Sequence, residues 1–154
     1  MAAGNRSVSE AAGEMPQELS LEELLDNFEL LEDWDARYAY LVELGEALPP
    51  LPEKLRTEEN RVKGCMSQVW VCAQPLDSHS QRIFYQGDCD TAIIKGVLAV
   101  LVGLYSGRTQ AEIEELDVDG LFDRLGLKEN LSPNRHVGVY AIIDLMQEQA
   151  RQVA

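Results

Sequence analysis

The three cysteines of this sequence, Cys65, Cys72 and Cys89, are the first candidates for chemistry. Their number is odd and no two of them form a CxxC pair, so they fit neither a disulfide framework nor a zinc knuckle. In a reducing compartment they are expected to be free thiols. A free thiol acts as a nucleophile or a metal ligand when it is accessible, and as a small apolar side chain when it is buried.

Cys65 follows Gly64 at the point where a polar stretch approaches a predicted strand. Such loops expose functional groups, and glycine permits backbone turns that other residues resist. Lys63 is close enough in sequence to favour the thiolate over the thiol. A buried structural cysteine is equally compatible with this spacing. The residues alone therefore leave two interpretations of Cys65, a nucleophile and a structural thiol.

The other two cysteines occupy different settings. Cys72 lies in a run of valine, tryptophan and alanine, which indicates a buried side chain in a strand. Cys89, in "GDCDTA", flanks the start of an apolar helix, whose dipole can lower a thiol pKa. We interpret Cys89 as an incidental residue, and a resolving thiol or a metal ligand are the alternatives.

Charged residues near these segments are candidates for helix caps or for a site. Asp88 and Asp90 precede an apolar helix, a position where aspartate usually caps the first turn. Arg135 falls in the first turn of the last predicted helix, where a cation opposes the helix dipole. This conflict favours a carboxylate partner or a role at a site, with a solvated arginine as the alternative. His136, beside it, is a candidate base.

The chain has 154 residues and a formal net charge of −14, which suits one globular domain with a sizeable core. Such an acidic chain lacks the basic surface that nucleic-acid binding needs, and anionic membranes repel it. The longest apolar stretch is shorter than the ~20 residues of a membrane span, and the N-terminus lacks the apolar segment of a secretory signal. We expect a cytoplasmic protein with a disordered tail at residues 1–18 and one domain at residues 19–154.

Hydrophobic spacing predicts two helices first and two strands next. The first helix begins after Ser20, where Glu23 completes a capping box, and the second ends at "PPLP". Aromatic and β-branched residues predict strands at 67–74 and 82–88, joined as an antiparallel hairpin. The order of elements predicts an α+β fold, with helices packed on one side of a small antiparallel sheet.

Helices are predicted for the remainder of the chain. The apolar segment that ends at Gly107 predicts a central buried helix with an aspartate as its N-cap. Thr109 and Glu112 form a capping box for a short helix. The last helix is predicted to begin at Ser132, with Pro133 in the favoured first position.

Four segments of the chain resemble the SufE family of sulfur acceptor proteins, which includes CsdE. "VKGCMSQVWV" resembles the family's GCxSQVW signature, and "GDCDTAIIKG" resembles its GDSDAxIxKG segment. "LSPNRHVG" is similar to the LSPSRxxG segment, and "YLVELGEALPPLP" to the end of a family helix. The resemblance covers the chain from about residue 20 to the last helix. It implies a compact α+β domain similar to the scaffold proteins of iron–sulfur cluster assembly, such as IscU.

The resemblance implies that Cys65 accepts a sulfane sulfur from the persulfide of a PLP-dependent cysteine desulfurase of the SufS or CsdA type, and that the protein stimulates this enzyme. The sulfur then passes to a SufBCD-type scaffold. Asp90 and Arg135 match family residues of the active-site region and of partner activation. The PLP belongs to the partner, so we expect no cofactor and no metal on this chain. We expect a transfer partner, monomeric or weakly dimeric, rather than a stand-alone enzyme.

Two residues depart from the family pattern. Cys89 stands where serine or another small residue is usual, and a second thiol near Cys65 can form a regulatory disulfide or share the sulfur. Met66 stands where glutamine or another residue is common, and its apolar side chain is expected to help shield the thiol. We also expect Cys65 to be partly buried against apolar neighbours, because exposed thiolates and persulfides are oxidised or reduced. Docking would then expose it by moving the loop at 60–67.

Three other functions are compatible with the sequence. The first is a metal-binding scaffold of the IscU/SufU type, with Cys65, Cys89 and Asp90 around zinc or an iron–sulfur cluster. A missing third cysteine near the last helix argues against it. The second is a stand-alone cysteine enzyme, with His136 as the base for Cys65. The third is an adaptor that activates a desulfurase through its surface alone.

Overall fold

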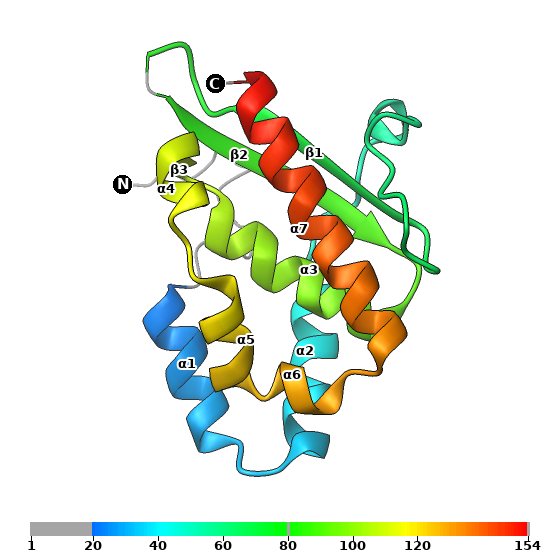
Figure 1. Cartoon of the computed structure of the whole chain (residues 1–154), viewed down its shortest axis with the longest axis vertical. Coiled ribbons are helices and arrows are strands. Elements are labelled where there is room, and N and C mark those ends of the chain that lie inside the picture. The colour runs from blue at the N-terminus through cyan, green and yellow to red at the C-terminus, as the bar shows by residue number, and fades with distance from the viewer. Residues whose placement is uncertain (1–19, 80, 154) are drawn as a thin grey trace.

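Figure 1 shows the chain as a small sheet with helices stacked against it. The computed structural model describes residues 20–79 and 81–153, and the tail predicted at 1–18 lies outside them. In chain order the described elements are α1 (Leu21–Leu30), α2 (Trp34–Glu46), the 3₁₀ helix η2 (Glu53–Leu55), β1 (Val69–Pro75), β2 (Arg82–Cys89), α3 (Ala92–Tyr105), β3 (Arg108–Thr109), α4 (Gln110–Glu114), α5 (Val118–Leu125), α6 (Leu127–Asn130) and α7 (Pro133–Val153). The η2 turn and the short β3 strand were not predicted.

Side-chain caps begin two of the helices where the sequence predicts them. At α1 the Ser20 hydroxyl accepts a hydrogen bond from the backbone N–H of Glu23, and the Glu23 carboxylate accepts one from the N–H of Ser20. Thr109 and Glu112 form the same reciprocal pair at α4. Each box satisfies backbone donors that the first turn of a helix leaves without a partner.

The sheet is antiparallel throughout the described residues, where β1, β2 and β3 form three strands in that order. The segment that precedes β1 covers its outer edge. The N–H of Val71 donates to the carbonyl of Asn60 at 2.9 Å, and the N–H of Val62 donates to the carbonyl of Val69 at 2.8 Å. The polar stretch before Cys65 therefore pairs with β1 and occupies an edge that would otherwise be open.

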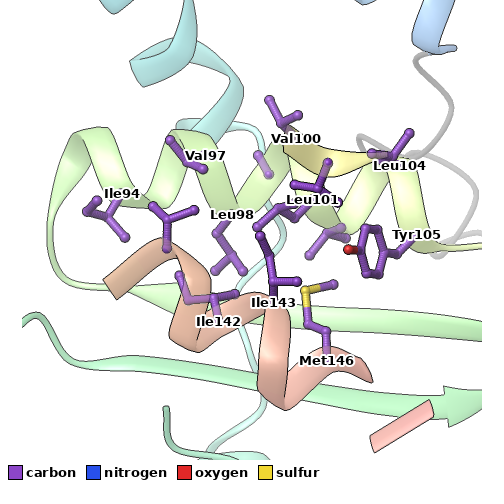
Figure 2. Packing of buried hydrophobic residues seen from close by; sticks show 14 of the residues in the cluster. Ile94, Val97, Leu98, Val100, Leu101, Leu104, Tyr105, Ile142, Ile143 and Met146 are labelled. Carbon is purple, nitrogen blue, oxygen red and sulfur yellow. The ribbon is translucent and has the colours of Figure 1, made fainter. Parts of the chain in front are cut away.

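Helix α3 is the centre of the hydrophobic core, as its apolar run predicts. Figure 2 shows its side chains meeting Ile142, Ile143 and Met146 of α7. The buried residues of α3 include Ile93, Ile94, Val97, Leu98, Val100, Leu101, Leu104 and Tyr105. Apolar residues cover most of its circumference because α2, α7 and the sheet all pack around it.

The predicted aspartate cap of α3 is wrong. The N-cap residue is Thr91, and no side-chain hydrogen bond caps the helix. Asp88 and Asp90 are engaged by other groups, because an arginine, a lysine and the loop before β1 lie within their reach. A sequence pattern cannot show such competing partners from distant segments.

Helices α2 and α3 cross at a close approach of their backbones. A Cβ atom on Gly96 would lie 2.2 Å from the carbonyl oxygen of Leu41, and one on Gly45 would lie 2.8 Å from the backbone nitrogen of Gly96. Neither position has space for a side chain, so the two glycines permit this crossing.

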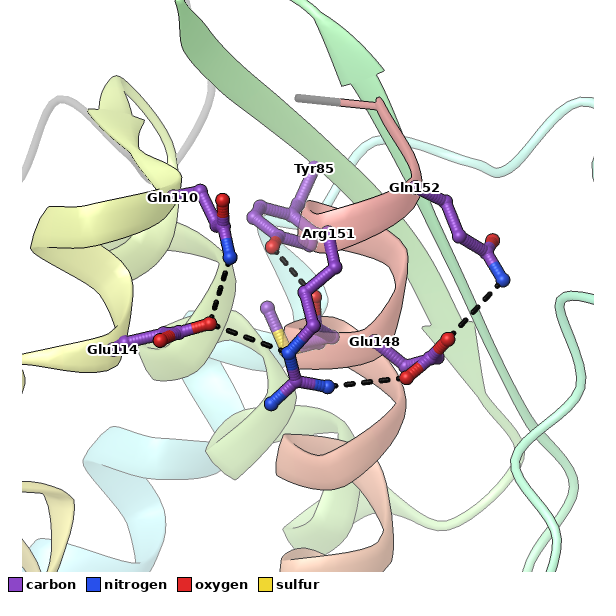
Figure 3. A network of polar contacts seen from close by, with 7 residues as sticks. Tyr85, Gln110, Glu114, Glu148, Arg151 and Gln152 are labelled. Carbon is purple, nitrogen blue, oxygen red and sulfur yellow. Dashed lines mark hydrogen bonds and ion pairs between the residues drawn. The ribbon is translucent and has the colours of Figure 1, made fainter.

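Helix α7 runs across β1 and α3 and is fixed at its C-terminal end. The Tyr85 hydroxyl of β2 donates to the carbonyl of Met146 at 2.8 Å. Arg151 joins Glu114 of α4 at 3.3 Å and Glu148 of its own helix at 3.1 Å, as Figure 3 shows. These contacts anchor the helix, so its N-terminal half keeps a defined position beside the loop that carries Cys65. The predicted α+β fold, a small antiparallel sheet packed on one side by helices, is confirmed.

No helix in the described ranges is both long enough and apolar enough to cross a membrane.

Candidate functional site

Cys65 lies in the loop that connects the edge segment to β1. Gly64 has a φ of +87°, a left-handed conformation that glycine adopts without strain, and it turns the chain so that Cys65 faces α7. The Cys65 thiol rests on Gly138 of that helix. A Cβ atom on Gly138 would lie only 2.7 Å from the sulfur and 3.4 Å from the Cys65 Cβ. The thiol therefore occupies the space that a side chain at position 138 would fill.

Cys65 is half-buried, and its side chain packs against the hydrophobic core. This matches the expected partial burial among apolar neighbours. Met66, in contrast, does not shield the thiol, because its side chain is 87% exposed. Val137, next to the glycine on which the thiol rests, is 61% exposed. Each residue of the Cys65–Gly138 contact therefore has an exposed apolar neighbour in the sequence, Met66 after Cys65 and Val137 before Gly138.

Asp90 fastens the loop that carries Cys65 to the start of α3. Its carboxylate accepts a hydrogen bond from the N–H of Gln68 at 3.0 Å, and its own N–H donates to the Gln68 carbonyl at 3.1 Å. The hydroxyls of Ser67 and Thr91 lie 2.6 Å apart and form a further link. Asp90 therefore fixes the backbone of the loop that carries Cys65.

Cys89 is buried at the end of β2, opposite Val69 of β1. Its sulfur accepts a hydrogen bond from the N–H of Thr91 at 3.4 Å. The pKa of Cys89 is raised to about 11, chiefly by burial; the hydrogen bond from the Thr91 N–H acts to lower it, and the negative charges of Asp90, a Cys65 thiolate and Asp88 add to the rise. The expectation that the helix dipole lowers this pKa is wrong, because desolvation of a buried thiol is the larger effect.

Cys72 is also buried, as predicted, with 9% of its surface exposed. Burial raises the pKa of its thiol, against a smaller lowering by a hydrogen bond with Asn60. Side chains alternate between the faces of a strand, so Cys72, three residues after Val69, points to the face opposite that of Val69 and Cys89.

An ion-pair network that the sequence did not reveal surrounds Asp88. Its carboxylate lies 2.6 Å from Arg56 and 3.2 Å from Lys95, and the Arg56 guanidinium stacks 5.0 Å from the centre of the Trp70 ring. Burial acts to raise the pKa of Asp88, but hydrogen bonds from Arg56, the Cys89 N–H and Lys95 outweigh it and lower the pKa. The network links Arg56, in the segment before β1, to Asp88 of β2 and Lys95 of α3. Asp88 is two residues before Asp90 in the chain.

Arg135 lies exposed in the first turn of α7, where its N–H donates to the Ser132 hydroxyl at 3.4 Å. Residues three apart share one face of a helix, so Arg135 is on the same face as Gly138, one turn away. Its guanidinium forms no ion pair within residues 20–79 and 81–153. The expected carboxylate partner is therefore not found in this part of the chain, and the cation is left exposed one helical turn before Gly138.

Two other expected neighbours of Cys65 have different partners. The His136 ring lies 2.9 Å from the carbonyl oxygen of Lys128, which does not support a role as base for Cys65. The Lys63 ammonium is 2.9 Å from the Glu58 carboxylate, so its charge is paired rather than directed at the thiol.

In the described residues no group of three histidine, cysteine, aspartate or glutamate side chains is arranged to hold a metal ion. The ligand set of the scaffold alternative, Cys65, Cys89 and Asp90, is therefore not assembled. Asp90 instead uses its carboxylate to bind the backbone of the loop.

Fold and site together define a small α+β protein that presents a half-buried thiol on a loop against a glycine of its last helix. The SufE family model, described as an Fe-S metabolism associated domain, matches residues 22–150. An uncharacterized SufE-like protein of Rhizobium etli is 41% identical over 133 residues, which cover 86% of this chain and 90% of that protein. Another, from Rhizobium meliloti, is 36% identical over 132 residues, which cover 85% and 94%. The chain belongs to the SufE family, which is associated with iron–sulfur metabolism.

A solved structure has a similar fold. The solution structure of a hypothetical protein from Thermus thermophilus matches with a TM-score of 0.68. The match covers 90% of this chain and 96% of that chain, at 23% sequence identity.

Proposed function

We propose that this protein accepts a sulfane sulfur on Cys65 from the persulfide of a PLP-dependent cysteine desulfurase, and passes it to an iron–sulfur cluster assembly scaffold of the SufBCD type. The observation that carries the proposal is the setting of Cys65. Its half-buried thiol lies on the loop that follows Gly64 and packs against the backbone of α7 at Gly138, where there is no side chain. Membership of a family associated with iron–sulfur metabolism supports it.

The transfer follows the chemistry of thiol–disulfide exchange. The Cys65 thiolate attacks the outer sulfur of the desulfurase persulfide and forms a new S–S bond. The bond between that sulfur and the desulfurase cysteine breaks, and the desulfurase cysteine leaves as a thiolate. Cys65 then carries the persulfide, and the same exchange in reverse order delivers the sulfur to the scaffold. No electrons enter or leave the pair of proteins, so the step needs no cofactor on this chain.

The surroundings of Cys65 suit a carrier that is protected between two dockings. Contact with Gly138 limits access to the thiol from one side, and the links from Asp90 and Ser67 keep the loop closed. We expect the desulfurase to contact the exposed apolar side chains of Met66 and Val137, and the loop to open when it does. In the same account Arg135, exposed on the same helix face, binds a carboxylate of the partner.

Stimulation of the desulfurase tests the proposal against the adaptor alternative. The rate of alanine formation from L-cysteine is measured with a SufS-type desulfurase alone and with wild-type protein, Cys65→Ser or Cys72→Ser added. Sulfur acceptance predicts that wild type and Cys72→Ser raise the rate equally, and that Cys65→Ser leaves it at the rate of the desulfurase alone. Full stimulation by Cys65→Ser would contradict the carrier function and favour an adaptor.

A further inference from the structure

A second thiol lies next to the site. Cys89 ends the strand that pairs with β1, and the next residue along, Asp90, is bonded twice to Gln68 of the Cys65 loop. The hydroxyls of Ser67, two residues after Cys65, and Thr91, two residues after Cys89, lie 2.6 Å apart, and a Cys65 thiolate contributes to the raised pKa of Cys89. The loop thus folds back over the end of β2 and brings an accessible and a buried sulfur into one neighbourhood.

We propose that Cys89 is a resolving thiol for Cys65, so that oxidation of Cys65 by a peroxide ends in a reversible Cys65–Cys89 disulfide rather than in irreversible damage. The proposal concerns a modification of these two residues and does not depend on a partner protein.

The chemistry consists of two balanced steps. The Cys65 thiolate first attacks one oxygen of hydrogen peroxide, the O–O bond breaks, hydroxide leaves, and Cys65 becomes a sulfenic acid. The Cys89 sulfur then attacks the Cys65 sulfur, and the S–O bond breaks. The Cys89 proton and the departing hydroxide form water as the disulfide is made. Peroxide is the oxidant, and both thiols together supply the two electrons.

The two thiols differ in the way that these roles require. Cys65 is half-buried and so accessible to a small oxidant, whereas Cys89 is 7% exposed. A buried, protonated thiol resists direct oxidation, because the thiolate is the reactive form. The order of events is therefore set by access, with Cys65 oxidised first and Cys89 second.

Geometry also excludes Cys72 as the resolving partner. Its side chain points to the opposite face of β1 from the Val69–Cys89 pair, so the sheet separates its sulfur from the loop. A disulfide needs the two Cα atoms to lie within about 7 Å of each other. Gly64, directly before Cys65, gives the loop backbone the freedom to bring the Cα of Cys65 within that distance of the Cα of Cys89. Cys72→Ser is therefore a matched control, a buried thiol in the same strand pair without the proposed role.

The disulfide also has a consequence that rests on the proposed function. A Cys65 sulfur bonded to Cys89 has no thiolate with which to attack a persulfide, so sulfur uptake stops until a dithiol reductant reopens the bond. The oxidised form is therefore an inactive but recoverable state of the carrier.

Intact-mass and peptide analysis of the purified chain after hydrogen peroxide treatment tests the proposal. Wild type and Cys72→Ser are expected to lose two hydrogen atoms, to yield one linked peptide that contains Cys65 and Cys89, and to return to the starting mass with dithiothreitol. Cys89→Ser and Cys89→Ala are expected to gain two or three oxygen atoms on Cys65, which dithiothreitol does not remove. Circular dichroism confirms that each variant is folded before treatment.

Two results would overturn the inference. One is that wild type accumulates the same oxygen-rich Cys65 as Cys89→Ser. The other is that the linked peptide contains Cys72 or joins two copies of the chain. Neither measurement involves a desulfurase. A negative result here therefore does not contradict the sulfur-acceptor function, and a failure of sulfur uptake does not contradict the disulfide.

Discussion

The contact between Cys65 and Gly138 yields a prediction that can be worked out from the structure. A methyl group on residue 138 would lie 2.7 Å from the Cys65 sulfur, whereas nonbonded heavy atoms normally approach to about 3.5–4.0 Å. The substitution Gly138→Ala therefore requires the sulfur, and the loop that carries it, to move outward by about 1 Å. We expect Cys65 in this variant to react with iodoacetamide faster than in the wild type.

Two opposing effects on the free energy of unfolding accompany this movement. Alanine stabilises a helix interior by about 1 kcal/mol relative to glycine. Overpacking against the sulfur costs about 1–3 kcal/mol, so Gly138→Ala alone is expected to be neutral or destabilising. In a Cys65→Ala background the sulfur is absent and the remaining contact to the Cβ at 3.4 Å relaxes easily, so the same substitution is expected to stabilise the protein.

Urea denaturation of the wild type, both single variants and the double variant measures this coupling. We expect the effect of Gly138→Ala to differ between the two backgrounds by about 1–3 kcal/mol. Val137→Ala is the matched control, because it changes an exposed neighbour and should have the same effect in both backgrounds. An identical effect of Gly138→Ala with and without the sulfur would refute the contact on which the site is built.

Three further predictions concern the residues around the loop. Asp88→Asn, which unpairs Arg56 and Lys95, is expected to lower the free energy of unfolding by roughly 1–3 kcal/mol at about pH 7 in urea denaturation. Because the pKa of Asp88 is lowered in the folded state, its contribution is present above the ordinary value of 3.8 and is lost as the pH falls through the folded value. The deficit of the variant should therefore shrink at about pH 3, and an unchanged deficit would contradict the ion pair. Asp90→Ala should cost about 1 kcal/mol and speed alkylation of the loop thiol, since it releases the loop backbone. Arg135→Ala should change the free energy of unfolding by less than about 0.5 kcal/mol but slow sulfur uptake from the desulfurase, and an unchanged uptake would remove it from the proposed docking surface.

Much of the fold was predictable because local signals agree with the tertiary structure. The capping boxes at Ser20 and Thr109 depend on residues three apart, and both are formed as predicted. The apolar run of α3 requires burial on all sides, and the structure provides it. In contrast, the edge pairing of Asn60 with β1 and the short β3 strand leave no periodic pattern, because a few backbone hydrogen bonds define them.

The sequence proposed candidate residues for the site but not their arrangement. The sequence identified Cys65, but only the structure shows that Gly138, 73 positions along the chain, makes space for its sulfur. Asp90 was expected to cap a helix and instead binds the loop, because the Gln68 backbone lies within its reach. The raised pKa of Cys89 likewise follows from burial in a tertiary core, which sequence position alone does not reveal.

The most direct test of the account is the mass of this protein after incubation with a cysteine desulfurase, PLP and L-cysteine. Intact-mass spectrometry of wild type and Cys72→Ser is predicted to show the gain of one sulfur atom, removed by dithiothreitol, and peptide mapping should locate it on Cys65. Cys65→Ser should gain none. Sulfur bound equally by Cys65→Ser, or no sulfur on a wild type that forms a complex with an active desulfurase, would contradict the claim that Cys65 is the sulfur acceptor.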